Sequence, residues 1–199
     1  PDAALQAKLG LTGCTVVGFI GSFYAYEGLD LLIAALPALI QARPDVKVLL
    51  VGGGSQEANL RQQAQQLGVA DRVVFAGRVP HQEVSRYYDL INVLAYPRHP
   101  MRLTELVTPL KPYEAMAMEK ALVVSAVGAL LEIVTEGETG RTFTPEDPVS
   151  LADTIEPLLD DPAARARLGS AARTWVAANR TWDQNGRRYL ELYQRLGIA

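Results

Sequence analysis

Short apolar segments alternate with amphipathic helical segments along most of the chain, and this alternation constrains the fold more than any other feature. Strands are expected at 15–20, 46–54, 72–79, 91–97, 121–126 and 139–145. Continuous Val/Leu/Ile strands that alternate with helices are typical of a parallel sheet covered on both faces. The sequence therefore predicts an α/β fold with right-handed crossovers.

The segments between these strands have helical periodicity. Helices are expected at 29–44, 55–69, 81–90, 109–119 and 128–137, with a longer loop at 98–108. After the Gly52–Gly54 turn, Ser55 is a suitable N-cap for the helix that follows. Parallel sheets of this kind bind ligands beyond the carboxyl ends of their strands, so these loops are the first place to look for a site.

From residue 148 onward the pattern is helical only, with breaks near Asp161-Pro162 and near 179–183. We expect one domain over 1–199, with a sheet core at about 12–147 and a helical tail at about 148–199. The tail should pack onto the same domain, and Trp175 and Trp182 are expected to contribute to that packing.

Composition excludes several classes of protein. The formal charge is −3 without a long run of one sign, which disfavours a nucleic-acid partner. Cys14 is the one cysteine, so no internal disulfide forms and a reducing, cytoplasmic location is expected. No apolar run approaches the ~20 residues of a membrane span. The first residues do not resemble a signal peptide, and the missing initial Met suggests a piece of a longer protein.

Two familiar site types are disfavoured. The "VGGGSQE" segment places Glu57 where a dinucleotide fingerprint needs its third glycine. For a metal, His81 and His99 lie far apart in the sequence, the cysteine has no partner and no Asp-x-Asp is present. We therefore expect neither a bound dinucleotide nor a metal.

The stretch "LVTPLKPYEAMAMEKALVVS" at 106–125 is the most informative. Thr108 and Pro109 suit the cap and first position of a helix. Lys111 then lies in the first turn, where the helix dipole disfavours a cation. An anion such as phosphate, bound between Lys111 and the amides of Leu110 and Lys111, would explain this placement.

One turn further along, Glu114 can reach the same cleft. A carboxylate accepts hydrogen bonds from both hydroxyls of a ribose. The alternative is a surface pair between Lys111 and Glu114, three residues apart, which would stabilise the helix only slightly. The pattern alone leaves these two interpretations open.

Several segments resemble one family in the same order along the chain: "GFIGSF…EGLDLLIAALP", "VLLVGGG", "DRVVFAGRVP…EVSRYYDLINVLAYP", "LKPYEAMAMEKALVVS" and "TGRTFTPEDPVSLADTIEPLLDDP". The chain resembles the C-terminal, donor-binding domain of group 1 (family 4) glycosyltransferases, which is one half of a GT-B fold and a Rossmann-like sheet. The form P-x-K-x-x-E resembles an exopolysaccharide- or exosortase-associated branch of that family.

The resemblance implies transfer of a sugar from a nucleoside diphosphate sugar, with retention of configuration and without a metal. The acceptor would be a polysaccharide or a lipid-linked sugar, and the full-length protein could contact the inner face of a membrane. The N-terminal acceptor domain would precede residue 1, so this piece alone should bind donor without transferring sugar. The closing "TWDQNGRRYLELY" resembles helices that lean back on that other domain.

Departures from the family pattern concern the charged residues. The first of the family's two glutamates would fall on Leu106, with Glu105 one position away. The first loop, usually G-R-x-x-x-x-K-G, has Ser22 and Glu27 in place of its two cations. A diphosphate needs compensating charge, and the candidates are Lys111, Arg98 and Arg102.

The resemblance gives roles to individual residues. Glu114 would bind the ribose, Leu110 and Lys111 would meet the diphosphate beside Thr108 and Arg98, and Glu105 would reach the transferred sugar. The other donor-binding positions are Gly21 and Ser22 in the first loop and Arg78 and Val79 beside the base.

Two alternatives remain open: a non-catalytic nucleotide-binding module that lost activity with its cations, and a sugar-nucleotide epimerase of similar architecture.

Overall fold

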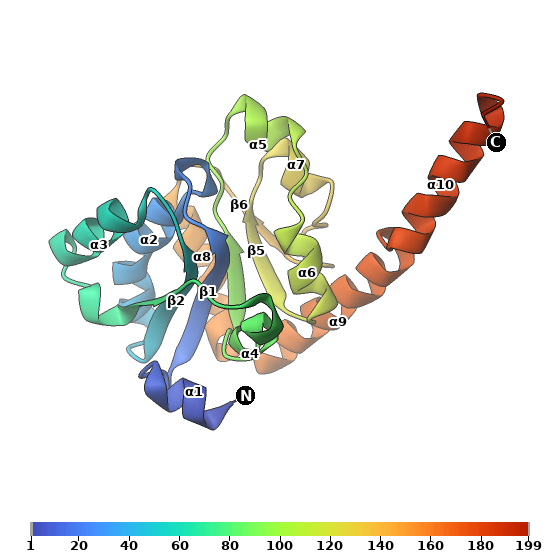
Figure 1. The fold of residues 1–199 in the computed structure, drawn as a ribbon. Helices are drawn as coiled ribbons and strands as arrows, with labels where there is room; N and C mark the ends of the chain where they lie inside the picture. The colour runs from blue at the N-terminus through green and yellow to red at the C-terminus, as the bar shows by residue number, and fades with distance from the viewer. Residues whose placement is uncertain (1, 199) are drawn as a thin grey trace.

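The computed structural model describes residues 2–198, and one parallel sheet forms its centre (Figure 1). The strands are β1 (Thr15–Ser22), β2 (Val46–Gly53), β3 (Val73–Gly77), β4 (Val93–Tyr96), β5 (Ala121–Ser125) and β6 (Arg141–Phe143). Their order across the sheet is β3-β2-β1-β4-β5-β6, and every neighbouring pair is parallel. The predicted Rossmann-like α/β fold is confirmed.

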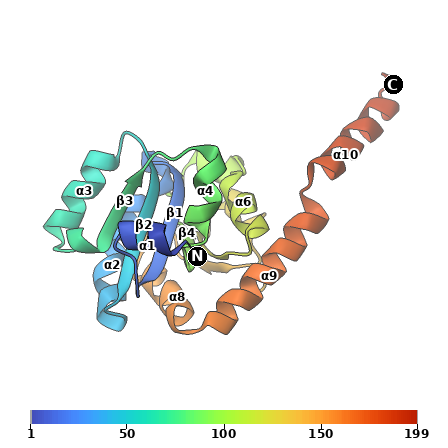
Figure 2. The same cartoon turned by 60° about the horizontal axis from the view of Figure 1, so that its bottom comes forward.

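Helices cover both faces of this sheet. They are α1 (Ala3–Lys8), α2 (Leu29–Ala42), α3 (Glu57–Gln66), α4 (Val84–Tyr88), α5 (Arg102–Leu106), α6 (Lys111–Ala117), α7 (Gly128–Leu131), α8 (Pro148–Asp160), α9 (Pro162–Asn179) and α10 (Trp182–Arg195), with short 3-10 turns η1 (Ala25–Glu27), η2 (Ala70–Arg72) and η3 (His81–Glu83). Helices α2, α3 and α8 lie on one face, and α4 and α6 lie on the other (Figure 2). All residues of β4 and β5 are buried, as the apolar strands predicted.

The order in which strands are added to the sheet reverses at β1, so that the later strands β4 to β6 extend its other side. Strands β2 and β3 extend the sheet on one side of β1, whereas β4, β5 and β6 extend it on the other side. The connections that follow β1 and β4 therefore leave toward opposite sides, and β1 and β4 form the switch point at which sheets of this kind bind ligands, at their carboxyl edge. This edge carries the candidate site.

A close backbone contact joins the two connections. Gly28, at the end of the β1–α2 loop, has φ +69°, and a Cβ built on it would lie 1.9 Å from the carbonyl oxygen of Pro97. Only glycine combines this conformation with this approach. The loop after β1 is thereby held against the loop after β4.

Three local expectations were wrong. The expected loop at 98–108 contains α5, and the expected helix at 128–137 ends after one turn at Leu131. A turn closed by the side chain of Thr139, which accepts from the amide of Thr135 at 2.9 Å, replaces the rest of that helix. Ser55 does not cap α3, because the amide of Gln56 bonds to the carbonyl of Phe23 and the helix begins only at Glu57.

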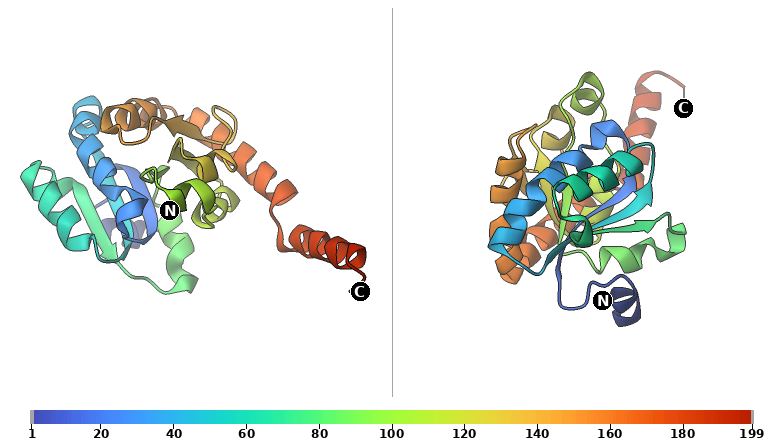
Figure 3. Two further views of the ribbon diagram at one scale, coloured as in Figure 1. Left: turned by 90° about the horizontal axis from the view of Figure 1, so that it is seen from above. Right: turned by 90° about the vertical axis from the view of Figure 1, so that its left-hand side faces the viewer.

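The tail has two parts. Helices α8 and α9 bury apolar side chains against the domain, and Trp175 stacks on Tyr113 with ring centroids 6.4 Å apart. Helix α10 has no buried residue and projects away from the body (Figure 3). The expected packing of Trp182 was wrong, since this side chain is 85% exposed at the first position of α10.

Candidate functional site

A buried carboxylate lies at the carboxyl edge between β1 and β4. Glu27, at the end of η1, is 1% exposed. Its Oε2 accepts from Arg98 Nε at 3.2 Å, and its Oε1 accepts from Arg98 Nη2 at 3.4 Å and from Lys111 Nζ. Burying an isolated carboxylate would be costly, and here two cations compensate one negative charge. We call Glu27, Arg98 and Lys111 the charge cluster; its formal charge is +1.

Lys111 reaches Glu27 by lying across the end of β1. A Cβ built on Gly21, which has φ +152°, would lie 2.4 Å from Lys111 Cε and 3.1 Å from its Nζ. The ammonium is also 5.1 Å from the centroid of the Phe19 ring. Gly21 therefore makes room for the lysine side chain, a role the sequence did not suggest. The Lys111 side chain is still 25% exposed, so solvent can reach the cation.

The expectation that Thr108 caps the helix was wrong. A helix that started there would need the amide N–H of Pro112 to bond to the carbonyl of Thr108, and proline has no such donor. The first turn forms instead from Glu114 to the carbonyl of Leu110 at 3.2 Å, with Leu110 as the cap. The Thr108 hydroxyl donates to Glu132 at 3.3 Å. Helix α6 is only seven residues long, so its dipole is weak. The ion pair with Glu27, which needs no anion bound at the helix end, therefore explains why a lysine is found at the start of α6.

The two candidate glutamates lie in different surroundings. Glu105 is on α5, and its Oε2 accepts from the amide of Gly128 at 2.7 Å, so it holds the start of α7. Glu114 is exposed on α6, with the hydroxyl of buried Tyr88 3.5 Å from its Oε2. Burial and then the charge of Glu114 raise the pKa of Tyr88, which keeps the phenol protonated. No Lys111–Glu114 ion pair forms, because the lysine turns toward Glu27.

A hollow of about 290 Å³ lies beside the charge cluster, at the ends of β1, β2 and β3. Gly21, Ser22, Arg78 and Val79, four of the positions that the resemblance assigns to donor binding, line it together. The Lys111 side chain lies against Gly21 and so connects this hollow with Arg98 and α6. Among the other candidates, Leu110 and Arg102 are exposed at the same edge, whereas Thr108 and Glu105 contact α7 and the segment that follows it.

His99 forms a second charged contact that the sequence did not reveal. Its Nε2 lies 2.8 Å from Asp30 Oδ1 on α2, and its Nδ1 lies 2.8 Å from Glu146 Oε1. Burial lowers the pKa of His99, but hydrogen bonds to the two carboxylates and their charges outweigh it and raise the pKa above its usual value. His99 thus ties the loop after β4 to α2 and to the segment before α8. Its partners are 69 and 47 residues away, so no local pattern indicated them.

This contact predicts a pH-dependent stability. Because the pKa of folded His99 is raised, its stabilising effect is fully present below about pH 6.5 and is lost as the pH rises through the folded value. Urea unfolding of the unchanged chain and of His99→Gln at about pH 5.5 and about pH 8 measures this effect. The stability difference between the two should shrink at the higher pH. A difference that is equal or larger there would contradict the contact.

None of the helices within residues 2–198 is long and apolar enough to cross a bilayer.

Comparison with known proteins identifies relatives over nearly the whole chain. A family model for group 1 glycosyl transferases matches residues 3–175. A GDP-mannose-dependent alpha-(1-6)-phosphatidylinositol monomannoside mannosyltransferase of Mycolicibacterium smegmatis is 32% identical over 196 residues, covering 96% of this chain and 51% of that protein. A glycogen synthase of Mycobacterium tuberculosis is 32% identical over 187 residues, covering 92% of this chain and 44% of that protein.

Solved structures agree with this assignment. Sucrose-phosphate synthase from Thermosynechococcus elongatus superposes with a TM-score of 0.82 at 31% identity, covering 98% of this chain and 49% of that chain. The C-terminal domain of a group 1 glycosyl transferase from Francisella tularensis has the same fold, with a TM-score of 0.74 at 20% identity. The match covers 89% of this chain and 93% of that chain. The chain spans about half the length of the curated relatives it matches. It belongs to the group 1 glycosyltransferases and has the C-terminal domain of their GT-B fold.

Proposed function

We propose that this chain is the donor-binding half of a retaining glycosyltransferase that takes its sugar from a nucleoside diphosphate sugar. The observation that carries the proposal is the position of Lys111 across Gly21. It brings a cation to the end of β1, where the first loop has Ser22 and Glu27 in place of the family's two cations. A solved relative, Anabaena HepE in complex with UDP-glucose, has a TM-score of 0.80 at 25% identity, which supports a nucleotide sugar as donor.

The charge cluster gives the diphosphate a place to bind. An ammonium has three N–H donors, and Lys111 uses one of them on Glu27. The other two can meet phosphate oxygens without breaking that pair. When the bond to the sugar breaks, negative charge develops on the leaving diphosphate, and a cation already in position stabilises it. Metal ions have no part in this proposal: the chain has no Asp-x-Asp, and within residues 2–198 no three ligand side chains gather to hold a metal.

The hollow beside the cluster is the proposed site of the nucleoside. Arg78 and Val79 lie at its wall, where their backbone can meet the edge of a base. Glu114 would accept from the ribose hydroxyls, with the Tyr88 hydroxyl beside it. Glu105 stays the weaker catalytic candidate, because the amide of Gly128 occupies one of its oxygens.

The rest of the enzyme is also part of the proposal. Since the curated relatives are about twice as long, we propose that a preceding acceptor domain completes the active site and that the exposed face of α10 leans on it. Two relatives, the phosphatidylinositol monomannoside mannosyltransferase and the glycogen synthase, support a lipid-linked or polysaccharide acceptor. An exopolysaccharide branch, a cytoplasmic location and contact with a membrane's inner face stay predictions.

Lys111→Ala tests the anion site. Calorimetric titration with UDP, GDP, ADP and their sugars should first find a nucleotide that binds. The substitution should then weaken binding of that nucleotide about tenfold, close to the lower end of the roughly 1.5–3 kcal/mol that a hydrogen bond to a charged group contributes, because the Lys111 side chain stays partly exposed to water. Lys8→Ala, at an exposed lysine of α1, is the matched control and should bind normally. Failure to bind any nucleotide, or unchanged affinity in Lys111→Ala, would remove the argument.

The loss of the two first-loop cations also supports a second candidate, a nucleotide-binding module without activity. Both candidates bind nucleotide, so calorimetry does not separate them. The full-length protein does: release of nucleoside diphosphate in the presence of acceptor supports the transferase. Binding without turnover supports the module, and interconversion of two nucleotide sugars would indicate an epimerase.

A further inference from the structure

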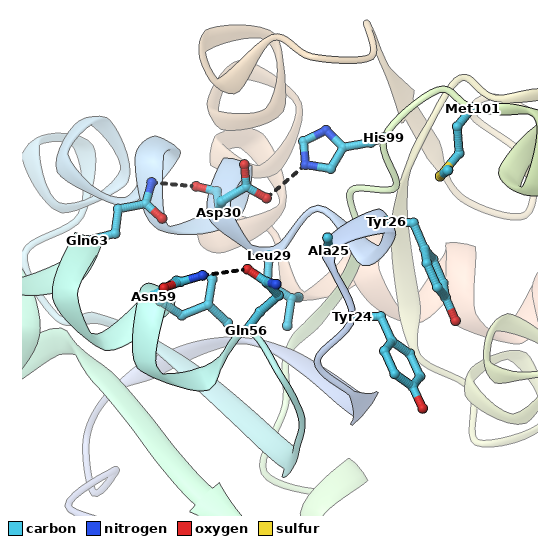
Figure 4. A pocket seen from close by; sticks show the side chains of 11 residues that line it. Tyr24, Ala25, Tyr26, Leu29, Asp30, Gln56, Asn59, Gln63, His99 and Met101 are labelled. Carbon is cyan, nitrogen blue, oxygen red and sulfur yellow. Dashed lines mark hydrogen bonds and ion pairs between the residues drawn. The ribbon is translucent and has the colours of Figure 1, made fainter.

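A separate cavity of about 330 Å³ opens on the α2 and α3 side of the β1–α2 loop (Figure 4). Its walls come from that loop, the first turns of α2 and α3, and the loop after β4. It shares no lining residue with the hollow beside the charge cluster. The volume lies at the lower end of the roughly 300–1,000 Å³ of small-molecule sites, which suits a ligand of one or two small rings.

One wall of this cavity is aromatic. Tyr24 and Tyr26 stack on each other, with ring centroids 5.4 Å apart and planes 21° apart. Tyr24 is 48% exposed, although an aromatic ring gains free energy from burial. The two rings lie on the same side of the cavity, below Met101 in the view of Figure 4. A flat apolar surface remains open here for a ligand to cover.

Other residues that line the cavity are polar and carry planar amide groups. Asn59 Nδ2 donates to Gln56 Oε1 at 2.9 Å, and Gln63 Nε2 donates to the carbonyl of Asp30 at 2.9 Å. These bonds fix the orientation of the amides. Within the described residues, Gln56 Nε2 and Asn59 Oδ1 make no hydrogen bond, so an unused donor and an unused acceptor remain at the two outer ends of this amide pair (Figure 4).

The charges around the cavity disfavour an anion. His99 is the one cationic candidate among its lining residues, and both of its ring nitrogens face carboxylates, Asp30 and Glu146. Arg98 lies over the ring of Tyr26 but forms its ion pair with Glu27. A phosphate bound here would thus lie beside the carboxylate of Asp30, and the described lining residues offer it no unpaired cation.

We propose that this cavity is a saccharide-binding site, distinct from the donor site. A pyranose ring has an apolar C–H face, which stacks on tyrosine, and a rim of hydroxyls that donate and accept hydrogen bonds at once. The exposed ring of Tyr24, together with the oriented amides and one carboxylate of the same cavity, matches both halves of that chemistry, without the positive charge that a nucleotide's phosphates require. The proposal does not depend on the identity of the donor.

Saturation-transfer NMR with maltotriose and with α-linked mannotriose as probes tests the site. A saturable signal from at least one of them is expected, and Tyr24→Ala should weaken its affinity about tenfold, the loss of one aromatic contact of about 1.4 kcal/mol. Asn59→Leu should weaken it as well, and it keeps the fold intact because Asn59 is an exposed residue bonded only to Gln56. Tyr189→Ala, at an exposed tyrosine of α10, is the control and should bind as the unchanged chain does.

Three results would overturn the proposal. The first is no saturable signal from either trisaccharide. The second is a signal that survives both Tyr24→Ala and Asn59→Leu. The third is displacement of the trisaccharide by uridine or UDP, which would place the ligand at the nucleotide site instead. Circular dichroism of Tyr24→Ala separates lost binding from lost folding, and nucleotide binding by the same variant shows independently whether the donor site is intact.

Discussion

A chain carrying Glu27→Gln is expected to unfold with a free energy about 3–5 kcal/mol lower than the unchanged chain, because removing one partner leaves buried charges uncompensated. Arg98 is the decisive partner, because its side chain is 8% exposed and pairs with no other carboxylate among residues 2–198. Lys111 is 25% exposed and can turn toward water. At about 2–4 °C per kcal/mol for a domain of this size, the melting temperature should fall by roughly 10 °C.

Urea unfolding measures this loss, and Glu156→Gln gives the matched control. Glu156 is exposed on α8 and belongs to no ion pair among the described residues, so the same chemical change should alter stability by less than about 0.5 kcal/mol. Removing both charges of the buried pair, with Glu27→Gln and Arg98→Met together, should cost less stability than the sum of the two single substitutions. Equal stability of Glu27→Gln and the control, or a double variant no better than the sum of its parts, would refute the role of the cluster.

The charge cluster also shows how far the sequence could go. Ser22 and Glu27 departed visibly from the family pattern, and Lys111 stood out as a cation in a first helical turn. The sequence could not show that Lys111 and Glu27 contact each other in the folded chain. Glu27 lies 84 residues from Lys111 and 71 from Arg98. Contacts over such separations depend on the pairing of β1 with β4 in the sheet, which the local periodicity of the sequence does not predict.

The strands were predictable because burial on both faces leaves a continuous apolar run, which is legible in a single sequence. The short elements were not. Helix α5 begins at an unusual cap, Met101, whose amide bonds to the Thr104 hydroxyl at 3.0 Å, and most of its side chains are exposed. The start of α6 at Lys111 could have been predicted, because Pro112 lacks the N–H donor that a cap at Thr108 requires. The preference for proline at a first helical position pointed the other way.

Glu114→Ala is expected to weaken binding of the cognate nucleotide roughly 30- to 100-fold, a larger effect than that of Lys111→Ala. A carboxylate that accepts from two ribose hydroxyls makes two charge-assisted hydrogen bonds, and losing both costs about 2–3 kcal/mol of binding free energy after water replaces them. Stability should hardly change, because Glu114 is exposed and the one side-chain hydrogen bond that it accepts within residues 2–198, from Tyr88, is 3.5 Å long. Glu138→Ala, at an exposed glutamate in a turn, is the matched control.

The ligand itself can show which atoms Glu114 meets. If the carboxylate binds ribose, the 2′-deoxy form of the cognate nucleotide should bind more weakly than the ribonucleotide to the unchanged chain, and this difference should largely vanish in Glu114→Ala. The corresponding nucleoside, which has no phosphates, should lose affinity in Glu114→Ala but not in Lys111→Ala, because the lysine acts on the diphosphate. An equal penalty for the deoxy ligand in both chains would place the ribose elsewhere, and Glu114 would then be a surface residue of α6.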